Sequence, residues 1–322
     1  MGFRGLAGWA PCCDSRLSVC GAVFLSAAPL FAQPLSRITI REESSRSTFS
    51  AGAQLVLIPV NVRDRHGATL TDLTQENFSV WEGKTPRPIV SFGSQDAPSS
   101  VGIILDTSGS MRWPLSAAKE VVTAFLKEAN VDDEFFLMTV SSQPEIQTAL
   151  TDRPEIVETA LRSAKARGNT ALVDTVYLGL DRLRSAKRSR RALLVVSDGV
   201  DNHSRYTLSE LMNVAVEADA QIFTVSVNEA IVNKRPVETI ADRHGLALMS
   251  ALAERTGGLN FEAPDLAHAA RAAYEAGSAL RNQYLIGIQP ELNDFGKWHS
   301  LKVQVNVPKA SVSARNGYRS PP

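Results

Sequence analysis

The middle of the chain alternates short apolar runs with segments of helical periodicity. Each run is nearly free of polar residues, as is typical of a strand covered on both faces. The runs occupy 101–106, 134–140, 192–196 and 221–227. Between them apolar residues recur three and four positions apart, as in Val121, Val122, Phe125 and Leu126. Strands that alternate with helices predict an α/β fold with a doubly wound, mostly parallel sheet flanked by helices.

Local signals place the remaining elements of this α/β segment. Thr207-Leu-Ser-Glu210 is a capping box that predicts the start of a helix. Further helices are predicted at 116–129, from 152 onward, at 172–183, 246–256 and 265–280. Short strands are predicted at 145–150 and 260–261, the first at an edge of the sheet. Residues 228–246 lack a clear period and predict an irregular insertion.

Both flanks show alternation of apolar and polar residues, which is strict over 301–307 and weaker over 312–318. Strands are predicted at 54–64, 78–82 and 89–92 before the α/β segment, and three more lie in 283–318. Each set has one apolar face to bury and is marginal alone in water. We therefore predict that the two flanks pair into one small β unit. The alternative is that the C-terminal strands extend an edge of the main sheet.

The N-terminus has the features of a secretory signal. Arg4 and Arg16 precede an apolar run over 17–32 that ends in Ala32, and this run is too short for a confident membrane span. We expect an exported, periplasmic or secreted protein without a transmembrane span in the mature chain, although an uncleaved anchor remains an alternative. The predicted organisation is a signal peptide at 1–32, a flexible leader at 33–50, an N-terminal β unit at 51–97, the α/β domain at 98–282 and C-terminal strands at 283–322.

Charge and cysteine content exclude several classes of function. The 34 basic and 34 acidic side chains balance, which argues against a general nucleic-acid binder. The cysteines are Cys12, Cys13 and Cys20, all inside the predicted signal. Removal of the signal would therefore leave no disulfide, cysteine zinc site or thiol nucleophile. The five histidines are scattered without metal-binding spacing.

Oxygen-bearing side chains follow two of the apolar strands and open one helix. They occur in Asp106-Thr-Ser-Gly-Ser110, Gly168-Asn-Thr170 and Ser197-Asp198-Gly199. In a parallel sheet, loops after the strands meet at one edge, where ligands bind. Any one of these residues alone could be a helix cap or turn residue. Their combination predicts a site for a hard divalent cation. The predicted metal ligands are Asp106, Ser108, Ser110, Thr170 and Asp198.

These three motifs together resemble the metal-ion-dependent adhesion site of von Willebrand factor A-type (VWFA) domains, and the resemblance covers about 98–282. It implies Mg²⁺, with Mn²⁺ or Ca²⁺ as possible substitutes, bound directly by Ser108 and Ser110. Thr170 would bind directly or through water, and Asp106 and Asp198 often through water. A carboxylate from an Asp or Glu of a protein partner would complete the shell.

The flanking sequences resemble a bacterial subfamily of secreted A-domain proteins that is abundant in acidobacteria. The matching segments are Pro59-Val-Asn-Val-Arg-Asp, Leu73-Thr-Gln-Glu-Asn-Phe-Ser-Val, Ser204-Arg-Tyr, Leu280-Arg-Asn-Gln-Tyr and Asn316-Gly-Tyr.

Other motifs carry weaker signals. Gly83-Lys-Thr85 lacks the earlier glycine of a phosphate-binding loop. Trp113 is either an exposed rim aromatic or a local packing residue, and Asp201-Asn202 is turn chemistry or a support for the site. His203 is a surface histidine or lies at the edge of the site. The basic run 187–191 is a solvated face or a contact for an acidic partner or lipid headgroup.

The first functional hypothesis is a non-enzymatic, metal-dependent, adhesion-type module that binds protein outside the cytoplasm. The alternative is a scaffolding or interaction subunit of a cell-envelope assembly in which the metal is mainly structural. An enzyme is disfavoured, because no nucleophile and base accompany the predicted ligands. The identity of the ligand and the oligomeric state stay open.

Overall fold

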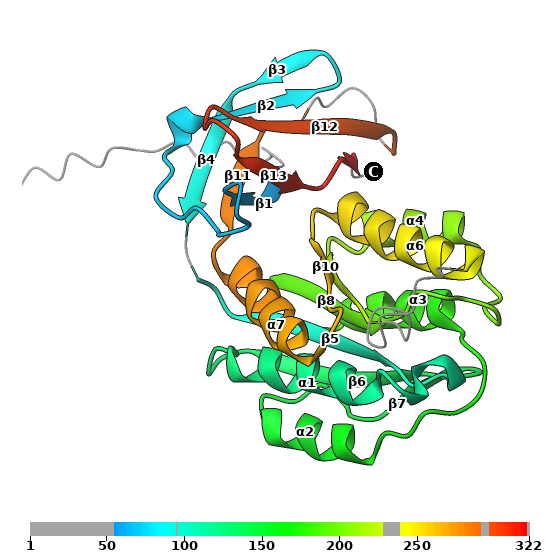
Figure 1. The fold of residues 1–322 in the computed structure, drawn as a ribbon. Helices are drawn as coiled ribbons and strands as arrows, with labels where there is room; N and C mark the ends of the chain where they lie inside the picture. The colour runs from blue at the N-terminus through cyan, green and yellow to red at the C-terminus, as the bar shows by residue number, and fades with distance from the viewer. Residues whose placement is uncertain (1–54, 95, 228–238, 291–295, 321–322) are drawn as a thin grey trace, which may run out of the picture. The chain divides into compact units, whose positions relative to one another are not determined.

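A six-stranded sheet forms the centre of the α/β segment in the computed structural model (Figure 1). Its order is β10 (Asn260–Glu262), β9 (Gln221–Ser226), β8 (Arg190–Ser197), β5 (Ser99–Asp106), β6 (Glu134–Val140) and β7 (Pro144–Ile146). The strands are parallel except β7, which pairs antiparallel with β6 at the edge. The doubly wound, mostly parallel sheet predicted from the apolar runs is confirmed.

The structure describes residues 55–94, 96–227, 239–290 and 296–320. The predicted signal peptide, the leader and most of the insertion at 228–246 therefore lie outside the described residues. Within the described ranges, no helix is both long and apolar enough to cross a membrane.

Helices cover both faces of the six-stranded sheet because successive residues of its strands point to opposite sides. Ile103 and Leu105 of β5 face one core, whereas Ile104 faces the other. The first core is shared with α1 (Leu115–Lys127), α2 (Pro154–Ser163) and α7 (Leu266–Arg281), and the second with α3 (Leu172–Leu183), α4 (Leu208–Glu217) and α6 (Ile240–Thr256).

The starts of α4 and α6 can be compared with the helix starts predicted from the sequence. The capping box before α4 is confirmed, because the Glu210 amide donates to Thr207 Oγ1 and the Glu210 carboxylate accepts from the Thr207 amide. The predicted start of α6 at 246 is wrong: the helix begins at Ile240 and carries its own capping box of Thr239 and Asp242. The first turns of α6 are polar and contain Gly245, so they lack the apolar period that marks a helix.

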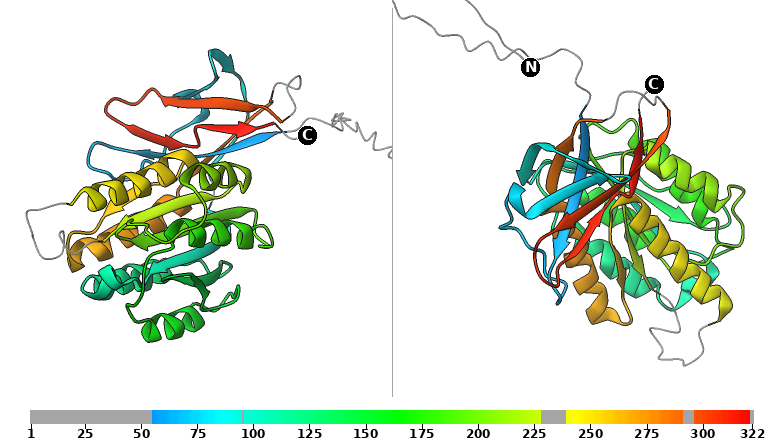
Figure 2. Two further views of the ribbon diagram at one scale, coloured as in Figure 1. Left: turned by 90° about the vertical axis from the view of Figure 1, so that its right-hand side faces the viewer. Right: turned by 90° about the horizontal axis from the view of Figure 1, so that it is seen from above.

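The two flanks pair strand by strand in two four-stranded sheets, as Figure 2 shows for the blue and red ends of the chain. One sheet contains β13 (Ser311–Ala314), β1 (Val56–Arg63), β11 (Tyr284–Ile288) and β4 (Ile89–Ser94), and the other β14 (Gly317–Arg319), β12 (Trp298–Val305), β2 (Phe78–Glu82) and β3 (Thr85–Arg87). In each, N-terminal strands pair with C-terminal ones. The predicted β unit of both flanks is thus confirmed. The Gly83-Lys84 pair turns the chain between β2 and β3, with Gly83 at φ +59°.

Tyr284 is a central contact of this β unit. Its side chain is fully buried, and its ring centroid lies 5.0 Å from that of Phe78 and 5.7 Å from that of Phe92. The hydroxyl donates to the carbonyl of Leu70 at 2.8 Å and accepts from the amide of Leu73 at 3.0 Å. This C-terminal side chain therefore satisfies the backbone of the N-terminal loop between β1 and β2.

Replacing Tyr284 by phenylalanine is expected to lower the free energy of unfolding by about 1–3 kcal/mol, because two backbone groups lose their partner. Urea denaturation measures the change. Tyr274→Phe is the matched control, since that side chain is 58% exposed. Equal midpoints for the two variants would show that the hydroxyl contributes nothing to joining the flanks.

Candidate metal site

The carboxyl ends of β5 and β8 bring two of the predicted ligands to the same edge of the sheet. Leu105 is paired with Val196, so Asp106 and Ser197 are neighbours on adjacent strands. The Ser197 hydroxyl donates to Asp106 Oδ2 at 2.5 Å. Asp198 follows directly. The strand register alone therefore places the first carboxylate beside the second loop.

The loop after β5 folds back toward Asp106. The Ser108 amide donates to Asp106 Oδ1 at 2.8 Å, and the Oγ atoms of Ser108 and Ser110 are 3.0 Å apart. Ser108 is buried, whereas Ser110 is exposed. Met111 is fully buried and anchors the short 3-10 helix Gly109–Arg112 that carries Ser110. Two hydroxyls thus converge where the site opens to solvent.

The third loop reaches the site through backbone contacts. The Gly109 amide donates to the carbonyl of Gly168 at 2.9 Å, which joins the loop before α3 to the loop after β5. The Thr170 amide donates to Asn202 Oδ1 at 3.0 Å, and the Thr170 carbonyl accepts from the amides of Asn202 and His203. Thr170, which is 2% exposed, is thereby fixed between two loops.

The loop of Asp198 depends on a close approach of two backbones. Asp198 Oδ1 accepts from the Val200 amide at 3.0 Å. Gly199 has φ +79°, which favours glycine, and a Cβ there would lie 2.3 Å from the Gly245 carbonyl oxygen. Helix α6 therefore passes directly against the loop that carries Asp198.

Among the described residues, the two carboxylates have no cationic partner. Asp106 is 0% exposed and Asp198 is 5% exposed, and none of the ion pairs in the described part of the chain involves either. Burial, followed by the negative charge of Asp198, raises the pKa of Asp106 to about 7, although hydrogen bonds from Ser197 and Ser108 oppose the rise. Burial also raises the pKa of Asp198.

This donor set fits a hard divalent cation. Two carboxylates and three hydroxyls are the oxygen ligands that Mg²⁺ and Ca²⁺ prefer, and a bound cation would offset the repulsion between the buried charges. Within the described ranges, no group of three or more His, Cys, Asp and Glu side chains is placed to hold a metal ion. At this edge of the sheet, serine and threonine hydroxyls would therefore have to complete the ligand set of Asp106 and Asp198.

The sequence patterns do not indicate one supporting residue, Ser197, whose hydroxyl donates to Asp106. Pairing the ends of β5 and β8 in register would have placed the Ser197 hydroxyl beside Asp106. For Asn202 the sequence leaves turn chemistry or a support for the site open, and its hydrogen bond from the Thr170 amide makes it a support. His203 contributes its backbone amide. Trp113 is 66% exposed, which favours the rim interpretation over local packing.

Part of the chain matches the model of a known protein family. Residues 101–200 match the family model of the von Willebrand factor type A domain. This A-type match runs from β5 to the loop after β8 and includes all five predicted ligands. No curated protein matches the chain.

Solved structures with A-type folds are similar to this chain at low identity. One is a von Willebrand factor type A protein from Catenulispora acidiphila, with 12% identity, 75% of each chain covered and a TM-score of 0.47. Another is an aerotolerance-related membrane protein from Bacteroides fragilis, with 17% identity, 56% of this chain and 98% of that chain covered, and a TM-score of 0.44. A third is the vWF domain of the type V pili tip protein Mfa5 from Porphyromonas gingivalis, with 11% identity, 57% and 95% covered, and a TM-score of 0.45.

Proposed function

We propose that the protein is a non-enzymatic binding module that captures a protein ligand through a divalent cation. The observation that carries this proposal is the pair of buried carboxylates, Asp106 and Asp198, which have hydroxyls around them and no described cationic partner. Ser108, Ser110 and Thr170 would contribute the neutral ligands. With neutral hydroxyls as the direct ligands and Asp106 and Asp198 acting through water, the cation would keep enough positive charge to accept a carboxylate from a partner.

The position of the hydroxyls supports an exposed face for the cation. Ser110 is exposed and its Oγ lies 3.0 Å from that of Ser108, whereas Ser108, Thr170 and Asp106 are buried. When bound, Mg²⁺ would supply a positive point charge with an open coordination position. The exposed indole of Trp113 lies three residues after Ser110 and would add apolar contact area beside an acidic anchor, since aromatic residues are enriched at binding hot spots.

The same chain supports a second function at this site. If the cation only neutralises Asp106 and Asp198, the module would be a scaffold of a cell-envelope assembly. Export rests on the apolar run over 17–32, and membership of a secreted bacterial subfamily rests on the flanking motifs. Both are part of the proposal.

Removing divalent cations is expected to release the protein ligand. Immobilised protein is exposed to envelope extract in Mg²⁺ or in EDTA, and retained proteins are quantified by mass spectrometry. A specific ligand should be retained in Mg²⁺, fall by about tenfold or more in EDTA, and be lost from an Asp198→Asn variant. Asp132→Asn, which alters an exposed carboxylate elsewhere, is the matched control. A ligand retained equally in EDTA would favour the scaffold function and contradict metal-mediated capture.

Export is tested separately. The native protein is expected in the envelope or outside the cell, with an N-terminus near Gln33 after processing at Ala32. N-terminal sequencing measures the cleavage position. Recovery of the chain from the cytosol with Met1 intact would contradict export.

A further inference from the structure

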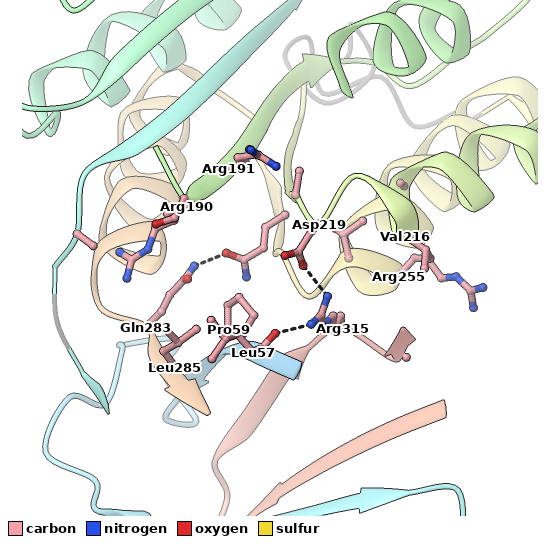
Figure 3. A pocket seen from close by; sticks show the side chains of 17 residues that line it. Leu57, Pro59, Arg190, Arg191, Val216, Asp219, Arg255, Gln283, Leu285 and Arg315 are labelled. Atoms are coloured by element: carbon pink, nitrogen blue, oxygen red, sulfur yellow. Dashed lines mark hydrogen bonds and ion pairs between the residues drawn. The ribbon is translucent and has the colours of Figure 1, made fainter. Parts of the chain in front are cut away.

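A second candidate site lies at the opposite end of the six-stranded sheet. A cavity of about 140 Å³ opens between the first residues of β8 and β9 and the strands of the β unit. Figure 3 shows Arg190 and Arg191 on one side of it, and Leu57, Pro59 and Leu285 on the other. Because β8 has eight residues, its two ends are about 23 Å apart at roughly 3.3 Å per residue. The cavity is therefore separate from the candidate metal site.

The wall on the side of the β unit is apolar and open to solvent. Leu57 is 40% exposed and Leu285 is 37% exposed, although both belong to strands whose alternate residues fill a core. Ala215 and Val216 of α4 also line the cavity. Apolar side chains left exposed in a concave site are typical of ligand pockets.

The charged part of the lining is strongly basic, with four arginines and one aspartate, and Ser189, Gln221, Thr256 and Gln283 add neutral polar groups. Arg315 is paired with Asp219 at 2.5 Å and also donates to the carbonyl of Leu57, as the dashed lines in Figure 3 show. Arg190 donates to the carbonyl of Leu280, and the negative charges of Asp96 and Asp133 stabilise its positive charge.

The other two arginines have no anionic partner in the part of the chain that the structure describes. Arg255 lies over the ring of Trp298, with its guanidinium carbon 4.4 Å from the ring centroid. Arg191 has neither a hydrogen bond nor an ion pair from its side chain to any described residue, and its Nε atom is buried without a partner. Partly buried guanidinium groups without a counter-charge are costly. The lining thus has an excess of positive charge beside an apolar wall.

We propose that this cavity binds a small organic carboxylate with an apolar body. The carboxylate pairs with Arg191, because the planar guanidinium suits bidentate pairing with a carboxylate. The apolar body packs on Leu57, Pro59 and Leu285. Apolar cavities of roughly 150 Å³ hold benzene, so the body is about the size of one aromatic ring.

Benzoate is the probe, with benzyl alcohol and benzylamine as neutral and cationic molecules of matched shape. Saturable binding to the full mature chain is measured by ligand-observed NMR, in EDTA so that the candidate metal site is not involved. Benzoate should bind at least about tenfold more tightly than benzyl alcohol, and benzylamine should not bind. Inorganic phosphate, which has no apolar body, should bind more weakly than benzoate.

Two variants and one control locate the site. Arg191→Gln should weaken benzoate binding by about tenfold or more, and Arg184→Gln, which alters an arginine 54% exposed outside the cavity, should leave it unchanged. Leu57→Gln changes the exposed apolar wall without altering charge, and it should also weaken binding. Absence of saturable benzoate binding, equal binding of benzyl alcohol or phosphate, or unchanged binding in both Arg191→Gln and Leu57→Gln would overturn the proposal.

Discussion

Replacing Asp198 by asparagine is expected to abolish Mg²⁺ binding and, in EDTA, to stabilise the protein. The reason for both effects is the same pair of charges. Asp106 and Asp198 are buried together without a described cationic partner. A bound cation is therefore attracted by both carboxylates, and without it two negative charges repel each other in a medium of low dielectric constant. Asparagine keeps the shape and one acceptor oxygen for the Val200 amide. We therefore expect the metal-free variant to gain about 1–2 kcal/mol.

Thermal unfolding with and without Mg²⁺ measures both effects. At a free Mg²⁺ concentration 100 times Kd, wild type should gain about 2.7 kcal/mol, roughly 5–10 °C in Tm for a domain of this size. The variant should gain nothing. Asp132→Asn is again the control and should behave as wild type. A Tm of the Asp198→Asn variant that rises with Mg²⁺ as much as that of wild type would contradict the assignment of this ligand.

Replacing Gly245 by alanine is expected to destabilise the protein, against the trend of helix propensity. In an exposed helix interior, alanine in place of glycine contributes about 1 kcal/mol. Here the added Cβ would lie 2.6 Å from the carbonyl oxygen of Asp198 and 2.8 Å from the carbonyl carbon of Gly199. Both contacts are to backbone atoms, so α6 or the Asp198 loop must shift. We expect a net loss of about 1–3 kcal/mol.

The Gly245→Ala variant should also bind Mg²⁺ more weakly, because the displaced loop carries Asp198. Urea denaturation and titration calorimetry measure stability and affinity. Ser250→Ala changes an exposed position of the same helix and should alter neither by much. A stabilised Gly245→Ala variant with unchanged affinity would show that α6 does not constrain the candidate metal site.

The sequence predicts the α/β fold because its buried strands are continuous apolar runs with helical periodicity between them. The β5 and β8 segments need no tertiary information to be recognised. The start of α6 could not be predicted in the same way. Gly245 is explained by a contact with Gly199, 46 positions away in the chain, and no local pattern reports such a contact. Likewise, Tyr284 satisfies the loop at Leu70 and Leu73 across more than 200 residues.

The candidate site was predictable where its residues follow strands and unpredictable where they support one another. Asp106 and Asp198 each end an apolar run, so the topology alone brings them to one edge. The role of Asn202 depends on how its loop folds over Thr170, which the sequence does not show. Asp106 is fully buried, so alanine at this position would disturb the fold as well as the candidate site. Ser197 and the Ser108 amide would lose their acceptor, so asparagine is the better substitution.

The central claim is that the five side chains hold one divalent cation, and a crystal grown with Mn²⁺ tests it most directly. An anomalous difference map locates manganese without reference to any partner. We expect one strong peak per chain, in contact with the hydroxyls of Ser108 and Ser110 and within reach of Thr170, Asp106 and Asp198. A fully grown crystal in Mn²⁺ with no peak at this edge of the sheet, or with its strongest peak elsewhere, would contradict it.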